Sequence, residues 1–147
     1  MRAEQLAEEF PTIGLDDSAV AAARFLANRC LPALIVVDHQ LHPYAVLPAS
    51  QVLRFMIPPY VQQDPALAGV VNEKAADQLG ASLSGHTVRE LLSGSLDELP
   101  VVEHDATAME IAEVMGRMHA SLVAVIRGDI LLGAVSATRL LEEILPQ

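Results

Sequence analysis

Residues that favour nucleic-acid binding are scarce in this chain. It contains no Trp, two Tyr and three Phe, so it offers few rings on which single-stranded bases could stack. Nine Lys and Arg residues stand against nineteen Asp and Glu residues, and the formal net charge is −10. Because this charge repels the phosphate backbone of DNA and RNA, we expect no nucleic-acid partner.

Cysteine is also scarce, and long apolar runs are missing. Cys30 is the only cysteine, which excludes an internal disulfide, and its place at the end of an apolar helix pattern predicts a buried, inert thiol. The charged start of the chain lacks the apolar region of a secretory signal. No apolar run approaches the ~20 residues of a membrane span. We therefore expect a cytoplasmic protein without direct membrane insertion.

Motifs for catalysis and metal binding are missing as well. Ser136 is not part of a Gly-x-Ser-x-Gly turn, and the chain has neither a Walker glycine loop nor a Gly-x-Gly-x-x-Gly fingerprint. His39 and His42 lie in one turn, but the neighbouring sequence offers no further Cys or His to complete a zinc site. We predict no catalytic residue, no metal site, no enzymatic activity and no required cofactor.

What the chain does contain is a regular succession of apolar segments and breakers. Its 147 residues are 52% hydrophobic, enough for one ordinary domain or two small packed repeats. In the first half, Asp16-Asp17-Ser18 supplies N-cap residues for a helix over 19–29. A buried strand, a turn, a second strand and a helix beginning with Pro48 are then predicted at 34–37, 38–43, 44–47 and 48–57.

The second half repeats this order. Thr107 and Glu110 have the spacing of a capping box. Helix, strand, strand and helix follow at 108–118, 122–126, 131–135 and 137–145. The two halves align at an offset of 89 residues, which becomes 88 after a one-residue deletion opposite Leu41. Because the elements and the helix breakers agree throughout, we predict an internal duplication.

Residues 58–85 separate the two copies. Ala66–Leu83 is rich in helix-forming residues, and this insert is expected either to pack on the repeats or to act as a lid or dimer contact. Thr87–Leu92 is predicted as a short helix that leads into the second copy and echoes the opening helix of the first. The predicted division is therefore repeat 1 (1–57), a helical insert (58–85) and repeat 2 (86–147), which together form one module.

Each copy of the duplicated β-α-β-β-α unit ends with a step from an apolar strand into a helix. This unit resembles the CBS domain, and the two copies resemble a CBS pair, or Bateman module. The resemblance implies an α/β (α+β) fold of two tandem repeats that pack through their sheets with pseudo-twofold symmetry, plus the helical insert. The passages that carry it are Leu34–Asp38 with Tyr44–Pro48 and Leu122–Ile126 with Leu132–Ser136.

The resemblance also implies a function. Such modules commonly bind adenosyl ligands in two clefts between the copies and regulate an enzyme, channel or transporter. It implies a stand-alone regulatory module that senses AMP, ADP, ATP or S-adenosylmethionine. This module would act in trans on an unidentified effector enzyme or membrane transporter, and it would form a homodimer.

The family's ligand site ends in Gly-x-x-Thr/Ser-x-x-Asp, where the hydroxyl and the helix start meet a phosphate and the Asp binds the ribose. In the second copy Gly133 and Ser136 match this pattern. Arg139 replaces the Asp; it cannot accept the ribose hydrogen bonds but could pair with a phosphate. The positions that would line the base are Val102, Glu103, His104, Ser121 and Leu122.

The first copy departs further from the pattern. Ala45 replaces the Gly, Pro48 replaces the hydroxyl, and Gln51 replaces the Asp, although its amide oxygen could accept one ribose hydrogen bond. The second copy's cleft is therefore favoured as the ligand site. A CBS-fold protein-interaction module with non-binding clefts is the alternative. The positions that would line the base in the first copy are Ile13, Gly14, Pro32 and Ala33.

Overall fold

The computed structural model describes residues 1–69, 78–92 and 99–146, which form two three-stranded sheets and the helices around them. In each sheet the first strand runs parallel to the middle strand, and the middle strand is antiparallel to the third. The strands of one sheet are β1 (Thr12–Gly14), β2 (Ala33–Val37) and β3 (Pro43–Pro48), and those of the other are β4 (Val101–Glu103), β5 (Leu122–Arg127) and β6 (Ile130–Ser136).

The strand register confirms the duplication. Thr12 of β1 pairs with Ile35 of β2, and Val101 of β4 pairs with Ala124 of β5. Val101 follows Thr12 by 89 residues in the sequence, and Ala124 follows Ile35 by the same number. The parallel pair of the first copy is therefore repeated residue for residue in the second.

The one-residue difference between the copies lies in the hairpins. Val36 pairs with Ala45 in the first sheet and Val125 pairs with Gly133 in the second, so the offset has changed from 89 to 88 across the turn. The register shifts at the same place in both sheets, directly after Val36 and after Val125. In the longer hairpin Leu41 adopts a positive φ of 65°, a conformation in which the extra residue turns the chain.

Polar side chains begin the long helices as their sequences predict. Ser18 accepts a hydrogen bond from the Ala21 N–H at the start of α2 (Ala19–Asn28), and Thr107 accepts one from the Glu110 N–H at the start of α7 (Ala108–Met118). These bonds satisfy N–H groups that have no partner within the helix. Pro48 lies one position earlier than predicted, as the N-cap of α3 (Ala49–Met56). The chain closes with α8 (Ala137–Ile144).

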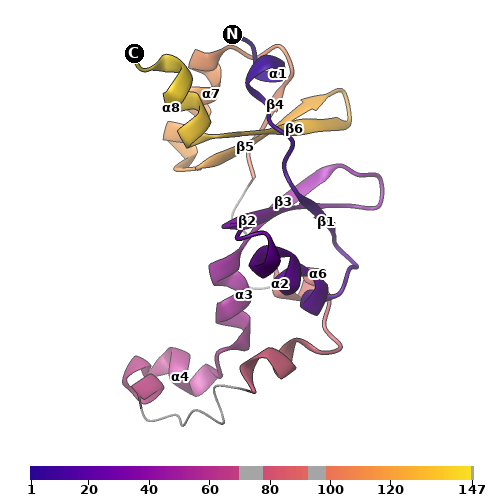
Figure 1. Cartoon of the computed structure of the whole chain (residues 1–147), viewed down its shortest axis with the longest axis vertical. Coiled ribbons are helices and arrows are strands. Elements are labelled where there is room, and N and C mark those ends of the chain that lie inside the picture. Colours follow the sequence, from indigo (N-terminus) through magenta and orange to yellow (C-terminus); the bar gives the residue numbers. More distant parts are fainter. Residues whose placement is uncertain (70–77, 93–98, 147) are drawn as a thin grey trace.

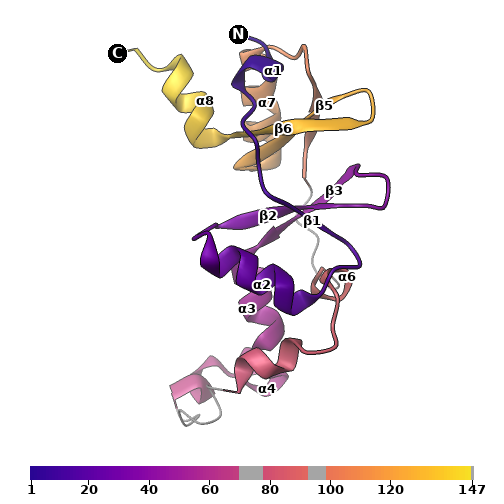
Figure 2. The ribbon, with the colours of Figure 1, turned by 45° about the vertical axis from the view of Figure 1, so that its right-hand side comes forward.

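The two sheets lie face to face in the middle of the molecule, and helices cover their outer faces. Figures 1 and 2 show α7 and α8 outside the sheet of β4–β6 and α2 and α3 outside the sheet of β1–β3. Between the sheets, buried Ile35 and Val37 of one copy pack with Ala134 of the other. Because apolar side chains from both copies share this layer, the predicted packing of the repeats through their sheets is confirmed.

The short helix that precedes each copy packs on the other copy. Ala3 and Leu6 of α1 (Ala3–Leu6) are buried in the core beneath α7 and β5, whereas Val88 and Leu91 of α6 (Val88–Leu91) are buried in the core beneath α2 and β2. Figure 1 shows α1 beside the sheet of β4–β6 and α6 beside α2. The two copies therefore exchange their leading helices.

Backbone hydrogen bonds fix the exchanged helices in equivalent ways. The Ala3 N–H donates to the Ala106 carbonyl at 2.7 Å, ahead of α7, and the Val88 N–H donates to the Asp17 carbonyl at 2.9 Å, ahead of α2. The packing units consequently differ from the predicted repeats 1–57 and 86–147. An apolar stripe on a short helix indicates that the helix is buried, but it does not indicate which copy will bury it.

The described part of the insert consists of short helical turns. These are α4 (Pro59–Gln63) and two 3₁₀ helices, η1 (Pro65–Gly69) and η2 (Leu79–Leu83), of which only Leu83 reaches the core. Part of the helix-prone stretch Ala66–Leu83, residues 70–77, lies outside the described residues. In Figures 1 and 2, α4 lies at the end of the molecule opposite the sheet of β4–β6, so it does not cover the space between the sheets.

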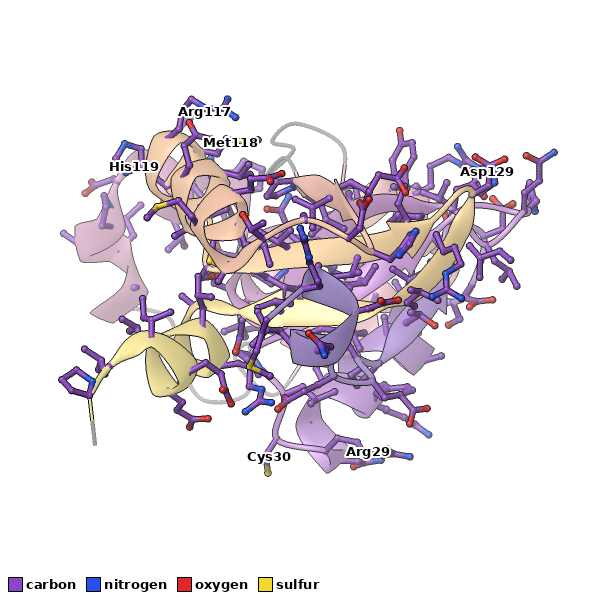
Figure 3. All side chains as sticks on the ribbon, turned by 90° about the horizontal axis from the view of Figure 1, so that it is seen from above. Arg29, Cys30, Arg117, Met118, His119 and Asp129 are labelled. Carbon is purple, nitrogen blue, oxygen red and sulfur yellow. The ribbon has the colours of Figure 1, made fainter. Side chains whose placement is uncertain are left out.

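Cys30 is exposed, so the prediction of a buried thiol is wrong. It follows Arg29, the C-cap of α2, and has a positive φ of 51° that ends the helix. Because the chain leaves the helix before Cys30, this residue does not lie on the buried face of α2. Figure 3 shows Cys30 at the edge of the molecule.

The carboxylate of Asp38 organises the first hairpin. Its Oδ1 accepts hydrogen bonds from the backbone N–H groups of Gln40 and His42, each at 2.9 Å. The bond from His42, with a further contribution from Gln40, lowers the pKa of Asp38 below its ordinary value because both bonds favour the charged carboxylate.

Asp38→Ala is expected to destabilise the protein at pH 7, and the loss should shrink as the pH falls toward 2. A carboxyl group with a lowered folded pKa stabilises the protein above its unfolded pKa, about 3.9, and this contribution disappears as the pH drops through the folded pKa. Urea unfolding across this pH range measures the difference. Asp129→Ala, at the tip of the other hairpin, is the control. A loss that stayed constant or grew in acid would contradict the charge effect.

Candidate ligand-binding cleft

A cleft of about 710 Å³ opens between the two copies, at the end of the sheets where β2 and β5 begin. We call it the inter-repeat cleft. The first copy contributes the segment before β1, the start of β2 and the end of β3, and the second contributes the end of α7, the start of β5 and the start of α8. Its lining residues are Phe10, Pro32, Ala33, Val46, Pro48, Met118, His119, Ala120, Ser121, Leu122, Ser136 and Thr138.

Six of the residues predicted to contact a ligand meet in this one cleft. They were assigned from sequence to two separate clefts, three from each copy. The structure brings them together because β2 and β5 begin at the same end of the stacked sheets, so equivalent positions face a common space. The six residues are Pro32, Ala33, Pro48, Ser121, Leu122 and Ser136.

The helix starts at the cleft already use part of their hydrogen-bonding capacity. Ser136 Oγ accepts the Arg139 N–H at 3.1 Å as the N-cap of α8, and the Ala137 N–H donates to the Ser121 carbonyl at 2.9 Å. In the first copy the Ala49 N–H donates to the Pro32 carbonyl at 2.9 Å, but Pro48 has no side-chain oxygen. Ser136 therefore acts as a helix cap, and a ligand can reach only the remaining lone pair and proton of its hydroxyl.

Gly133 lies outside the inter-repeat cleft, at a close crossing of two backbones. Its neighbour Ala134 exchanges two backbone hydrogen bonds with Glu8, each at 2.9 Å, which adds the N-terminal segment to the edge of β6. A Cβ at Gly133 would stand 2.5 Å from the Glu8 carbonyl oxygen. A residue without a side chain is therefore required at this position for packing, whether or not a ligand binds.

Arg139 is held by carboxylates. Its guanidinium lies 2.7 Å from Glu143, 3.4 Å from Glu8 and 4.0 Å from Glu142, and its side chain is 25% exposed. It does not line the inter-repeat cleft. Because Glu8 belongs to the segment that crosses β6, Arg139 links that segment to α8, and its contact with a phosphate stays a prediction.

The remaining predicted residues of the second copy lie along and after β4. Val102 packs against the core beneath α7, Glu103 is exposed, and the His104 carbonyl accepts the Glu4 N–H at 2.9 Å. His104 Nδ1 is buried and lies 3.4 Å from Glu4 Oε2, in ion-pair range but without hydrogen-bond geometry. None of these three lines the inter-repeat cleft, because the exchanged helix α1 lies against this part of the second copy.

In the first copy, three predicted residues also lie away from the cleft. Ile13 is part of the apolar core, and the Gly14 N–H donates to Asp17 Oδ2 at 2.8 Å. Gln51 Nε2 donates to the Leu91 carbonyl at 3.0 Å, so its amide secures the exchanged helix α6. Their ligand contacts, like those of Arg139, stay predictions.

Sequence reasoning missed residues at the end of α7 and before β1. Met118 and His119 are not among the predicted ligand contacts, yet both line the cleft and lie side by side at the end of α7 in Figure 3. His119 and Cys30 occupy equivalent positions and share a positive φ of 51°. The repeat alignment itself, which places both residues between a helix and a strand, was the signal that could have found them.

A second cavity of about 580 Å³ lies at the opposite end of the sheets, near the two hairpins. Phe10 lines both this cavity and the inter-repeat cleft. Glu9 and Asp129 place acidic groups at the second cavity, next to the apolar side chains of Leu41 and Ile130. Its acidic lining disfavours an anionic ligand there.

Comparison of the sequence with protein-family models gives no match, and comparison with curated proteins gives none either. A solved structure from Kribbella flavida DSM 17836, a CBS domain-containing protein of unknown function, is 51% identical to this chain, covers 99% of both chains and has a TM-score of 0.93. The chain belongs to the CBS domain-containing proteins. Its two repeats form a CBS pair.

More distant structures share the fold. The CBS domain of a membrane protein from Sphaerobacter thermophilus is 20% identical, covers all of this chain and 90% of its own, and has a TM-score of 0.73. The Arabidopsis thaliana CBS-pair protein CBSX2 is also similar, and its complex with AMP is 12% identical, covers 97% of this chain and 94% of its own, with a TM-score of 0.67. At these identities the likeness concerns the architecture of the CBS pair.

Two further properties concern the described residues alone. Within 1–69, 78–92 and 99–146, no helix is long and apolar enough to cross a membrane. Over the same ranges, no group of three or more His, Cys, Asp and Glu side chains is placed to hold a metal ion.

Proposed function

We propose that this CBS pair is a regulatory module that binds an adenosyl ligand in the inter-repeat cleft and acts on another protein in trans. The observation that carries the proposal is the cleft itself, which joins both copies and offers about 710 Å³. Clefts of about 300–1,000 Å³ accommodate ligands of nucleoside size. The AMP complex of CBSX2 supports an adenosyl ligand.

The position of the cleft explains how binding could regulate a partner. A ligand that contacts Ala33 of one copy and Ser121 of the other would favour the spacing of the copies that fits it best. That preference would change the outer surfaces that a partner meets. The proposed ligands are AMP, ADP, ATP and S-adenosylmethionine, and the proposed effector is an enzyme or a membrane transporter.

A homodimer is part of the proposal. Three apolar side chains of the last helix and its C-cap, Leu141, Ile144 and Leu145, are at least half exposed. Exposed apolar groups of this kind mark contact surfaces when they lie together. Sedimentation equilibrium would measure the oligomeric state, and a monomer at the highest soluble concentration would contradict this part.

Thermal denaturation with a ligand panel tests the proposed binding. A ligand present at 100 times its Kd stabilises the folded protein by about 2.7 kcal/mol, which corresponds to a rise in Tm of several degrees for a domain of this size. The panel comprises adenosine, AMP, ADP, ATP and S-adenosylmethionine. Absence of a shift with all five at millimolar concentration would contradict the proposal.

Ser121→Phe is expected to weaken binding of any ligand in the panel at least tenfold. The Ser121 side chain is exposed at the cleft, so a phenyl ring there would occupy ligand space without disturbing the core. Ser50→Phe is the matched control, because Ser50 is exposed on α3 and does not line the cleft. Calorimetric titration of both variants would measure the difference. If Ser121→Phe bound the ligand as tightly as Ser50→Phe, the ligand site would have to lie elsewhere.

The second candidate function is a protein-interaction module whose cleft binds no nucleotide. The observation that favours it is the pairing of Arg139 with Glu8 and Glu143, where a ribose-binding carboxylate was expected. This function predicts that no ligand raises the Tm while a protein partner is still bound. The same thermal panel therefore separates the two candidates.

A further inference from the structure

The described residues that line the inter-repeat cleft carry no fixed charge. Among the described residues that line it, His119 is the only one with a titratable side chain. Three others carry hydroxyl groups, namely Ser121, Ser136 and Thr138, and the rest are apolar. The side chains at the cleft can therefore exchange hydrogen bonds with a ligand, but Lys or Arg groups that would neutralise a chain of phosphates are missing from this lining.

The cationic side chain that follows the lining residues along α8 is already neutralised. Arg139 comes directly after Thr138, yet its guanidinium lies 2.7 Å from Glu143 and 3.4 Å from Glu8. A phosphate would have to compete with these carboxylates for Arg139 and would be repelled by them. The net charge of the chain, −10, adds to this repulsion at longer range.

Backbone donors at the cleft are also partly committed. The first N–H of α3, from Ala49, and the first N–H of α8, from Ala137, both donate to carbonyl groups of their own copy. The Arg139 N–H donates to Ser136 Oγ. These bonds remove three of the donors with which two helix N-termini would otherwise bind an anion.

The apolar part of the lining suits a flat ring. Phe10 is the only aromatic side chain besides His119 among the described lining residues, and it stands with Pro32, Leu122 and Met118 around the same space. Aromatic rings and thioethers pack well against a planar heterocycle. The hydroxyls of Ser121 and Thr138 can pair with ribose or ring nitrogen atoms.

We propose that the inter-repeat cleft selects an uncharged nucleoside, of the adenosine class, over nucleoside di- and triphosphates. This inference rests on the proposed function, because it names the ligand class of the same cleft. The neutral ligand keeps the ring and ribose contacts, whereas each phosphate brings negative charge to a site where the lining side chains provide no fixed cation to meet it.

Calorimetric titration with adenosine, AMP and ATP tests the selection. Adenosine should bind at least tenfold more tightly than ATP, with AMP between them. ATP binding as tight as or tighter than adenosine binding would overturn the inference and leave the proposed ligand site standing. Absence of binding by all three would instead overturn the proposed site and this inference with it.

A variant that is expected to bind ATP more tightly provides the second test of this selection. Thr138→Arg adds a cation to an exposed position of the cleft and should improve ATP affinity several-fold while changing adenosine affinity little. Ala21→Arg adds the same charge on the exposed face of α2, outside the cleft, and should leave both affinities unchanged. Equal improvement of ATP binding by both variants would show that net charge, and not the cleft lining, controls selection.

Discussion

Leu91→Ala is expected to lower the free energy of unfolding by about 2–5 kcal/mol, the usual cost of truncating a buried leucine. Leu91 is 1% exposed and belongs to the exchanged helix α6, which fills the core of the first copy. Leu6, which is fully buried in the equivalent helix α1, should respond in the same way through the core of the second copy.

Both variants should weaken one shared unfolding transition. Each copy completes the core of the other, so neither copy can unfold alone. Unfolding of one copy removes a helix from the other and exposes apolar surface in both. Urea denaturation followed by circular dichroism measures the free energy and the number of transitions. Leu53→Ala is the control: Leu53 is 57% exposed on α3, and its truncation should cost less than about 0.5 kcal/mol.

Two separate transitions, with only one of them shifted by Leu91→Ala, would contradict the exchange of helices. A loss no larger than that of Leu53→Ala would contradict the burial of α6.

Gly133→Ala is expected to destabilise the protein by about 1–3 kcal/mol, as overpacking of a closed site commonly does. The new Cβ would lie 2.5 Å from the Glu8 carbonyl oxygen, so the N-terminal segment would have to move away from β6. That movement would strain the two hydrogen bonds between Glu8 and Ala134. Thermal unfolding of the variant would measure the loss.

Gly116→Ala is the matched control for this variant. Gly116 lies within α7, and a Cβ there would meet nothing within 4 Å. Alanine in a helix interior is favoured over glycine by roughly 0.5–1 kcal/mol, so this variant should be as stable as the natural protein or more stable. If Gly133→Ala were equally harmless, the close crossing of Glu8 over β6 would be wrong.

Local sequence signals were sufficient for most of the fold. The run Leu34–Val37 and its counterpart from Leu122 are continuous apolar stretches, and the structure extends them by a single residue at one end or the other. Ser18 and Thr107 start helices where their side chains predict a cap. These features depend on residues a few positions apart, so one sequence contains the information needed to find them.

The exchange of α1 and α6 could not be predicted in the same way. Leu6 and Leu91 show that each short helix has a buried side, but either copy offers an apolar surface to cover it. The choice depends on the length and path of the chain from α1 to β1 and from α6 to β4. These are properties of the folded molecule, whereas the apolar pattern is a property of the local sequence.

The site was predictable in part for a related reason. Ser121 and Pro32 were expected at the site because the resemblance to the CBS domain implies that their positions line the base, and the structure brings both to one cleft. Arg139 was expected near a phosphate, but Glu8, remote in sequence, lies beside it. The sequence around Arg139 does not indicate a partner from a remote segment, so this ion pair could be found only in the structure.

The measurement that tests the central claim most directly is an amide NMR titration of the full chain with adenosine and AMP. The inter-repeat cleft should give saturable chemical-shift changes at Ala33, Ser121 and Thr138, which come from both copies. Amides near the second cavity, such as Ile130, should change little. No change at millimolar ligand, or changes confined to one copy, would contradict a ligand site shared by the two repeats.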